Sequence, residues 1–193
     1  AVRCPPRGRV SRFGRPGATD MTPALSVVLV LASGRGERFR ASGGTVHKLQ
    51  ALLGDRPVMA HTLAAVQASG LPWHVEDAGH PGMGDSIAAA VRATADAPGW
   101  LVLPADLPLV EPDTLRQVAD ALVRPGVTAA QPVHAGQRGH PVGFGLACRD
   151  ALLALEGNQG AAPVLRAQRA MNSVADVETE DAGGARKAGS SAQ

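Results

Sequence analysis

A short, mostly apolar run, Ser26–Leu31, is followed at once by a small turn rich in glycine and arginine, Ala32–Phe39. A β-branched apolar run of this length is typical of a buried strand in a parallel sheet. Gly34 and Gly36 allow the backbone to approach an anion closely, because no Cβ blocks the approach and positive φ costs little. The pattern therefore predicts a buried strand that ends in an anion-binding loop.

Composition narrows the class of protein. The 193 residues fit one domain of ordinary size that can bury a core. A hydrophobic content of 45% with 3% aromatic residues and no tyrosine favours aliphatic packing between layers over a base-stacking surface. No apolar run approaches the roughly 18 residues of a membrane span. We therefore expect a protein with no membrane partner.

The formal net charge of +2 hides a segregation of charge. Residues 1–20 carry five arginines and one aspartate, whereas residues 21–181 carry twelve basic and sixteen acidic groups. A body with an acidic excess lacks the electrostatic basis for binding nucleic acid. We therefore expect no nucleic acid partner.

The two ends of the chain differ in composition from the rest. Residues 1–22 are rich in Pro, Gly and Arg and lack a hydrophobic stretch, which excludes a secretory signal and predicts a disordered extension upstream of the first element. A basic arm for nucleic acid is the alternative. Residues 182–193 are predicted to be a disordered tail. Cys4 and Cys148 lie far apart in the sequence, so we expect no disulfide framework and a cytoplasmic protein.

Helical and strand patterns alternate between these ends. Met59, Leu63 and Val66, for example, share one face of a helix. Helical patterns cover residues 57–70, 84–95, 111–122, 149–155 and 160–169. Strand patterns cover residues 26–31, 74–77, 100–103, 127–133, 142–146 and 173–177.

This alternation predicts an α/β fold of three layers with a mostly parallel sheet and right-handed crossovers. No repeat or linker indicates a second domain, so residues 23–181 are expected to form one domain. Ligands on such sheets bind beyond the carboxyl ends of the strands. We therefore expect the functional site in the loops at 32–48, 104–110 and 134–141.

Two residues in these loops suit a metal and a triphosphate. Asp106 follows the strand at 100–103 and lies between Pro104 and Pro108. A carboxylate held there suits Mg²⁺, which binds one or two carboxylates plus substrate phosphates. An Asx turn or a helix cap is the alternative for Asp106. Lys48 follows a glycine-rich stretch and has the reach to contact a bound triphosphate, with a solvated surface charge as its alternative.

Five segments together resemble the nucleotidyltransferases that build molybdenum cofactor dinucleotides. Their signatures are L-A-A-G-x-G-x-R with a downstream lysine, G-M-x-x-S-L, A-D-M-P, R-G-H-P and D-x-D-T-P-E-D. The matching segments, in order, are Leu31–Phe39 with Lys48, Gly82–Ile87, Pro104–Pro108, Gln137–Val142 and Asp176–Asp181. The R-G-H-P form resembles the molybdenum cofactor cytidylyltransferase branch of the MobA-like NTP transferase superfamily.

The resemblance implies a Rossmann-like nucleotidyltransferase that uses CTP and molybdenum cofactor as substrates, Mg²⁺ as cofactor and a recipient molybdoenzyme as partner. It implies a role in catalysis for Arg38, Lys48 and Asp106. It implies nucleotide binding by Ala32, Ser33, Gly34, Arg35, Gly36 and Ser86. It implies a metal site at Asp106 and Asp176, and contact with the acceptor, or shaping of its loop, by Arg138 and His140.

The chemistry agrees with these implied roles. Transfer of a nucleotidyl group to a terminal phosphate is an in-line displacement at the α-phosphorus and needs no protein nucleophile. The protein must neutralise charge and align two anions that repel one another. The arginines at 35 and 38 and a metal on Asp106 suit that task.

The chain departs from the family pattern in its middle. Residues 71–81 leave room for only one short strand, where the family has a further strand, so we expect a fold one element shorter than usual. Ser33, Glu178 and Glu180 replace the family's usual residues. The alternatives are a guanylyltransferase, a nucleotidyltransferase for another small metabolite, or a nucleotide-binding module without turnover. A zinc site is not expected, because the six histidines lack zinc spacing with cysteine.

Overall fold

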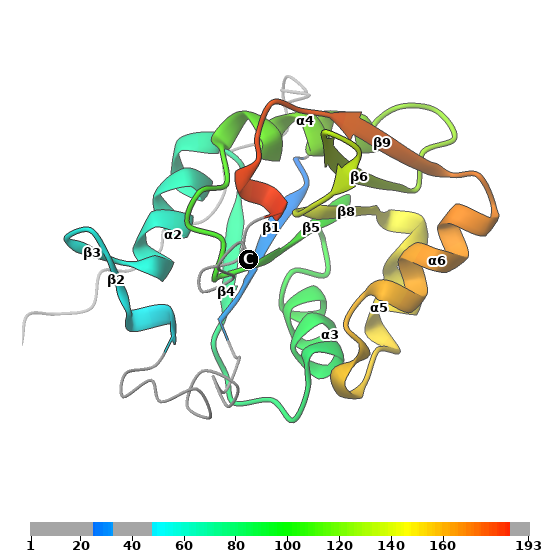
Figure 1. Cartoon of the computed structure of the whole chain (residues 1–193). Helices are drawn as coiled ribbons and strands as arrows, with labels where there is room; N and C mark the ends of the chain where they lie inside the picture. Colours follow the sequence, from blue (N-terminus) through cyan, green and yellow to red (C-terminus); the bar gives the residue numbers. More distant parts are fainter. Residues whose placement is uncertain (1–24, 33–47, 186–193) are drawn as a thin grey trace, which may run out of the picture.

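The computed structural model describes residues 25–32 and 48–185, which fold into a central sheet with helices on both faces (Figure 1). The strands of this sheet are β1 (Val27–Leu31), β4 (Trp73–Glu76), β5 (Gly99–Pro104), β6 (Ala129–His134), β7 (Gln137–Arg138), β8 (Val142–Gly145) and β9 (Val174–Glu178). The order across the sheet is β4-β1-β5-β8-β6, with β9 paired to β6. The expected three-layer α/β fold is confirmed.

Most strands of the main sheet run in one direction, and β8 and β7 run against their neighbours. The pairs β1 with β4, β1 with β5, and β6 with β9 are parallel. Strand β8 is antiparallel to both β5 and β6. Strand β7 pairs with the last residues of β6, and β8 pairs with the first, so the segment 139–141 interrupts a single antiparallel edge of β6.

Helices and turns connect these strands. The helices are α2 (Val58–Ser69), α3 (Met83–Ala93), α4 (Pro112–Leu122), α5 (Arg149–Leu153) and α6 (Ala162–Ala170). The 3-10 turns are η1 (Lys48–Gln50), η2 (Leu146–Cys148), η3 (Gly157–Gln159) and η4 (Gly183–Ala185). Strands β2 (Leu52–Leu53) and β3 (Arg56–Pro57) form a separate antiparallel pair. Within the part of the chain that the structure describes, no helix has both the length and the apolarity needed to cross a membrane.

Strand β1 is buried on both faces, as its apolar sequence predicts. Val28 and Val30 belong to the core that includes residues of α2 and α4. Leu29 and Leu31 belong to the core on the opposite face, with residues of α3, α5 and α6. Trp100 of β5 and Phe144 of β8 are fully buried in this second core. Alternate side chains of β1 therefore pack against the helices on opposite faces of the sheet, which holds the three layers together.

The single short strand expected within residues 71–81 is confirmed, and a comparison of its length with the family stays a prediction. Residues 71–81 form one strand, β4, which pairs with β1 and lies at the edge of the sheet among the described residues. At the other end, the domain boundary expected at residue 181 is followed by the turn η4. The boundaries of the domain stay predictions.

Strands β4, β1 and β5 end level with one another. Leu31 is the register partner of both Glu76 and Pro104. The chain continues beyond these ends into residues 33–47, into the start of α3 and into the segment that contains Asp106. This carboxyl edge is where an α/β sheet binds its ligands.

Candidate active site

The backbone of Asp106 is fixed at the carboxyl end of β5. The amide of Ala105 donates to the carbonyl of Leu31 (3.1 Å), which extends the pairing of β5 with β1. The Thr62 hydroxyl of α2 donates to the carbonyl of Ala105 (3.0 Å). Ala105 is 1% exposed and Leu107 is 0% exposed, whereas Asp106 between them is half-buried. Two buried neighbours therefore present this carboxylate at the sheet edge, as the sequence predicts.

The start of α3 is anchored within its own first turn. The hydroxyl of Ser86, which is 1% exposed, donates to the carbonyl of Gly82 (3.0 Å). Gly82 is the N-cap residue of α3 and has extended backbone. A contact between Ser86 and the nucleoside stays a prediction.

Glycine at 82 and 84 allows α3 to approach Glu156 and Gly157, at the start of η3. A Cβ at Gly82 would lie 2.3 Å from the carbonyl oxygen of Gly157, and one at Gly84 would lie 2.6 Å from that of Glu156. Asp85 accepts a hydrogen bond from the amide of Gly157 (3.0 Å). The G-M-x-x-S segment at the start of α3 therefore packs against η3. Asp85 of α3 accepts a hydrogen bond from the first residue of η3 and so caps that turn.

The R-G-H-P segment is held by hydrogen bonds on three sides. The amide of Gly139 donates to the carbonyl of Pro132 (2.9 Å), and the side chain of Gln131 donates to the carbonyl of Gly139 (3.0 Å). The amide of His140 donates to the carbonyl of Gly184 (3.0 Å). The peptide bond between His140 and Pro141 is cis. These contacts give the loop a defined shape.

Arginines from two elements surround Asp176 of β9. Arg138 binds one carboxylate oxygen and Arg169 binds the other, each at 2.9 Å. The hydrogen bonds from Arg138 and then from Arg169 lower the pKa of Asp176, and Asp176 in turn raises the pKa of Arg138. Arg169 also donates to the side chain of Gln131 (2.9 Å). Asp176 therefore belongs to the network that supports the R-G-H-P segment.

The sheet register also separates Asp176 from Asp106. Ala175, Ala130, Gly143 and Leu101 are consecutive partners across β9, β6, β8 and β5. Three strand spacings separate β9 from β5, which is about 14 Å. A metal role for Asp176 stays a prediction, and both its ion pairs and its position weigh against a metal shared with Asp106.

The other expected residues lie mostly outside the described part of the chain. The prediction places the triphosphate on Ser33, Gly34, Arg35, Gly36 and Arg38, none of which is among the described residues. The backbone of Lys48 begins η1, while its side chain is not described. Ala32 is described, and its amide donates to the carbonyl of Glu76 (2.9 Å).

A buried acidic residue that the sequence interpretation left unassigned lies beside Ala32. Glu76, the last residue of β4, has one carboxylate oxygen 3.0 Å from Nε2 of His80 and the other 3.5 Å from Nε2 of His74. Burial raises the pKa of Glu76, but the hydrogen bonds from His80, from the amide of Ala78 and from His74 together lower it below its ordinary value. In the sequence, His74 lies two residues before Glu76 and His80 lies four residues after it, at the end of a predicted strand. This spacing is the signal from which the cluster could have been predicted.

A magnesium ion at Asp106 stays a prediction. Mg²⁺ binds through one or two carboxylates and substrate phosphates and needs no cage of protein ligands. In the described ranges, 25–32 and 48–185, no group of three or more His, Cys, Asp or Glu side chains is placed to hold a metal. A single carboxylate with a fixed backbone at the carboxyl edge matches the Mg²⁺ preference.

Comparison with known proteins places this architecture in a family. The profile of the MobA-like NTP transferase domain matches residues 64–172. The chain belongs to this family. Among curated relatives, the bifunctional protein GlmU of Stenotrophomonas maltophilia is 30% identical over 155 residues, which cover 68% of this chain and 32% of GlmU. The MobA-like chain therefore spans about a third of the length of the curated relatives it matches.

Solved structures share the fold of this MobA-like domain. A nucleotidyl transferase from Methanothermobacter has a TM-score of 0.63 at 24% identity, covering 80% of this chain and 87% of that one. The molybdopterin-guanine dinucleotide biosynthesis protein A of Archaeoglobus fulgidus has a TM-score of 0.50 at 17% identity, covering 80% and 84%. The CMP:2-keto-3-deoxy-manno-octonic acid synthetase, solved with CTP, has a TM-score of 0.52 at 14% identity, covering 80% and 90%. The fold is that of the nucleotidyltransferase superfamily, to which this MobA-like chain belongs.

Proposed function

We propose that this MobA-like domain transfers CMP from CTP to the terminal phosphate of molybdenum cofactor and releases pyrophosphate. The observation that carries the proposal is the fixed position of Asp106 at the carboxyl end of β5, directly beside the end of β1. Strand β1 leads into the glycine- and arginine-rich segment that resembles the family's triphosphate loop. A carboxylate and an anion-binding segment at adjacent strand ends suit a nucleotide bound with a divalent cation.

The proposed reaction is one displacement. A terminal phosphate oxygen of the acceptor attacks the α-phosphorus of CTP, and the bond from that phosphorus to the oxygen bridging to the β-phosphate breaks. Arg35 and Arg38 are assigned to neutralise the leaving pyrophosphate, and Lys48 to contact the α-phosphate. Asp106 is assigned to hold Mg²⁺, which when bound would neutralise charge between nucleotide and acceptor. Ala32, Ser33, Gly34, Gly36 and Ser86 are assigned to bind the nucleotide.

The choice of CTP rests on the resemblance of the R-G-H-P segment to the cytidylyltransferase branch. The backbone of Gly139 and His140 is held by Gln131 and Gly184, so this segment presents a preshaped surface. We assign His140 to the substrate side of that surface and Arg138 to its support, because Arg138 pairs with Asp176. Among the structures that share the fold, the Archaeoglobus protein is by name a molybdopterin-guanine dinucleotide biosynthesis protein, and the CMP:2-keto-3-deoxy-manno-octonic acid synthetase was solved with CTP.

A guanylyltransferase for the same cofactor is the second candidate, because the Archaeoglobus protein of similar fold is by name a guanine dinucleotide protein. In either case we propose that residues 23–181 form the catalytic domain, that it acts in the cytoplasm and that a molybdoenzyme receives the product.

Pyrophosphate release from each nucleoside triphosphate, measured with and without Mg²⁺ and purified molybdenum cofactor, tests the proposal. We expect release that requires Mg²⁺ and the cofactor and that favours CTP over GTP by at least about tenfold in kcat/KM, because polar groups arranged for cytosine are left unpaired by a purine. A preference for GTP would assign the guanylyl reaction. The absence of release with any nucleotide and this acceptor would refute both.

A further inference from the structure

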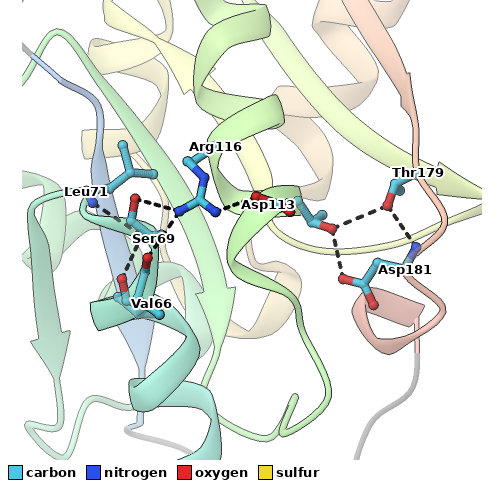
Figure 2. Close-up of polar contacts among 9 residues, drawn as sticks. Val66, Ser69, Leu71, Asp113, Arg116, Thr179 and Asp181 are labelled. Carbon is cyan, nitrogen blue, oxygen red and sulfur yellow. Dashed lines mark hydrogen bonds and ion pairs between the residues drawn. The ribbon is translucent and has the colours of Figure 1, made fainter.

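Asp181 is a buried carboxylate with a full set of hydrogen bonds. It is 5% exposed. One oxygen accepts hydrogen bonds from the amide of Glu111 (3.0 Å) and the hydroxyl of Thr114 (2.9 Å), and the other accepts one from the amide of Gly183 (2.5 Å). Figure 2 shows Asp181 facing the start of α4, beside Thr179. These partners satisfy the hydrogen bonding of the buried carboxylate.

The turn η4 that Asp181 binds lies against two loops of the candidate active site. A Cβ at Gly183 would lie 1.8 Å from the carbonyl oxygen of Leu109, in the segment that follows Asp106. A Cβ at Gly184 would lie 2.4 Å from the carbonyl oxygen of His140. The carbonyl of Gly184 also accepts the hydrogen bond from the amide of His140. The turn therefore touches the backbone of both loops, with no room for a side chain at either contact.

We propose that Asp181 is a positioning residue that locks η4 between the Asp106 loop and the R-G-H-P loop and so sets their spacing. The inference rests on the proposed function, because it gives Asp106 and His140 roles in the reaction. Asp181 binds the start of α4 and the turn at the same time. We expect removal of Asp181 to loosen the turn that contacts both loops.

Helix α4 has contacts with the core that do not involve Asp181. Helix α4 is anchored by Leu115, Val118 and Ala119, which are buried in the first core. The hydrogen bonds of Asp181 go to the helix start and to the turn. Its loss is therefore expected to loosen loops at the carboxyl edge of the sheet while the sheet and α4 stay folded.

Two variants test the lock. Asp181→Asn keeps the shape but replaces an oxygen acceptor with an NH₂ donor, and every partner of the carboxylate is itself a donor. Gly183→Ala keeps the carboxylate but introduces a Cβ 1.8 Å from the carbonyl oxygen of Leu109 and 2.8 Å from Oδ1 of Asp181, so it displaces the turn from both. If Asp181→Asn fails to fold, Gly183→Ala still tests the contact.

Two controls match these variants. Thr128→Val removes a hydrogen-bonded hydroxyl at the amino end of β6, where it donates to Ser173 (2.7 Å), far from the carboxyl edge. Gly79→Ala adds a Cβ that meets nothing within 4 Å.

Amide hydrogen exchange of the full chain, without substrate, is the first measurement. We expect Asp181→Asn and Gly183→Ala to raise the exchange rate of residues 105–110 and of the His140 amide by at least about tenfold, with little change in either control. Unchanged exchange at these amides, or an equal rise in Thr128→Val, would overturn the lock.

The second measurement separates this inference from the proposed function. In the pyrophosphate assay we expect the two lock variants to need several-fold more Mg²⁺ for half-maximal rate and to lose kcat by about tenfold, with KM for CTP nearly unchanged. Wild-type values in these variants would overturn the positioning role. An inactive wild type would refute the proposed function alone, and the exchange rates would then decide whether Asp181 holds the two loops.

Discussion

Asp106, Asp176 and Asp181 all belong to segments that resemble family motifs, but their surroundings in the structure differ. We therefore assign them different roles. Asp106 is half-buried on a fixed backbone at the sheet edge. Asp176 is paired with two arginines, and Asp181 is buried at the start of α4. The sequence motif predicts the position of Asp106, because its strand and flanking prolines are local. The role of Asp181 was not predictable, because its amide partner Glu111 lies 70 residues away in the sequence.

Replacing Asp176 with Asn is expected to lower the free energy of unfolding by about 0.5 to 1 kcal/mol at neutral pH, because the ion pairs are partly exposed. The arginines lower the folded-state pKa of Asp176 below its ordinary value of 3.8. This stabilisation is therefore fully present above the unfolded-state pKa and is lost as pH falls through the lower folded-state pKa.

Urea unfolding between about pH 6 and pH 2.5 measures this dependence. The difference between wild type and the Asp176→Asn variant is expected to be constant down to about pH 5 and to shrink below that pH. The exposed Asp120 of α4, replaced with Asn, serves as the control. A difference that grows on acidification would contradict the assignment of these ion pairs.

At the scale of elements, the apolar patterns predicted nearly every helix and strand of the main sheet within a few residues. They did not predict the direction of β8, because an apolar run has the same pattern in a parallel and an antiparallel pair. The pair β2 and β3 was also missed, since each strand has two residues and an exposed surface. Contacts between elements, such as that of α3 with Glu156 and Gly157, depend on tertiary packing that no local pattern contains.

The contact between the start of α3 and Glu156 gives a testable prediction about packing between elements. Gly84→Ala places a Cβ 2.6 Å from the backbone carbonyl of Glu156, which a side-chain rotation cannot relieve. We expect a loss of about 1 to 3 kcal/mol in the free energy of unfolding. Gly79→Ala, whose Cβ meets nothing within 4 Å, is expected to change stability little. Thermal melts of both variants compare these effects, and equal melting temperatures would show that α3 does not require glycine there.

At the scale of the whole molecule, one sheet brings segments from both halves of the chain to a single edge. The parallel strands place the Asp106 loop and the start of α3 beside the end of β1, and β6 and β9 carry residues that support the R-G-H-P segment. The sequence predicted this arrangement from the alternation of elements. It did not predict the turn η4 as a part of it, because residues 182–193 have the composition of a tail.

Deletion of residues 1–20 is expected to leave the melting temperature and the rate of pyrophosphate release nearly unchanged. That segment has no apolar residues at helical or strand spacing, so it cannot bury enough surface to contribute to the fold. A large drop in melting temperature, or loss of activity in the truncated protein, would show that the segment belongs to the domain.

The most direct test of the central claim is Mg²⁺-dependent pyrophosphate release from CTP by the wild type and by Asp106→Asn, with molybdenum cofactor as acceptor. The amide keeps the shape of the side chain and removes the charge assigned to the metal, so we expect a wild-type melting temperature and a loss of at least about a hundredfold in kcat. Asp120→Asn, on the exposed side of α4, is expected to keep the full rate. An Asp106→Asn enzyme with unchanged activity at saturating Mg²⁺ would contradict the assignment of Asp106 as the metal-binding carboxylate of a nucleotidyltransferase.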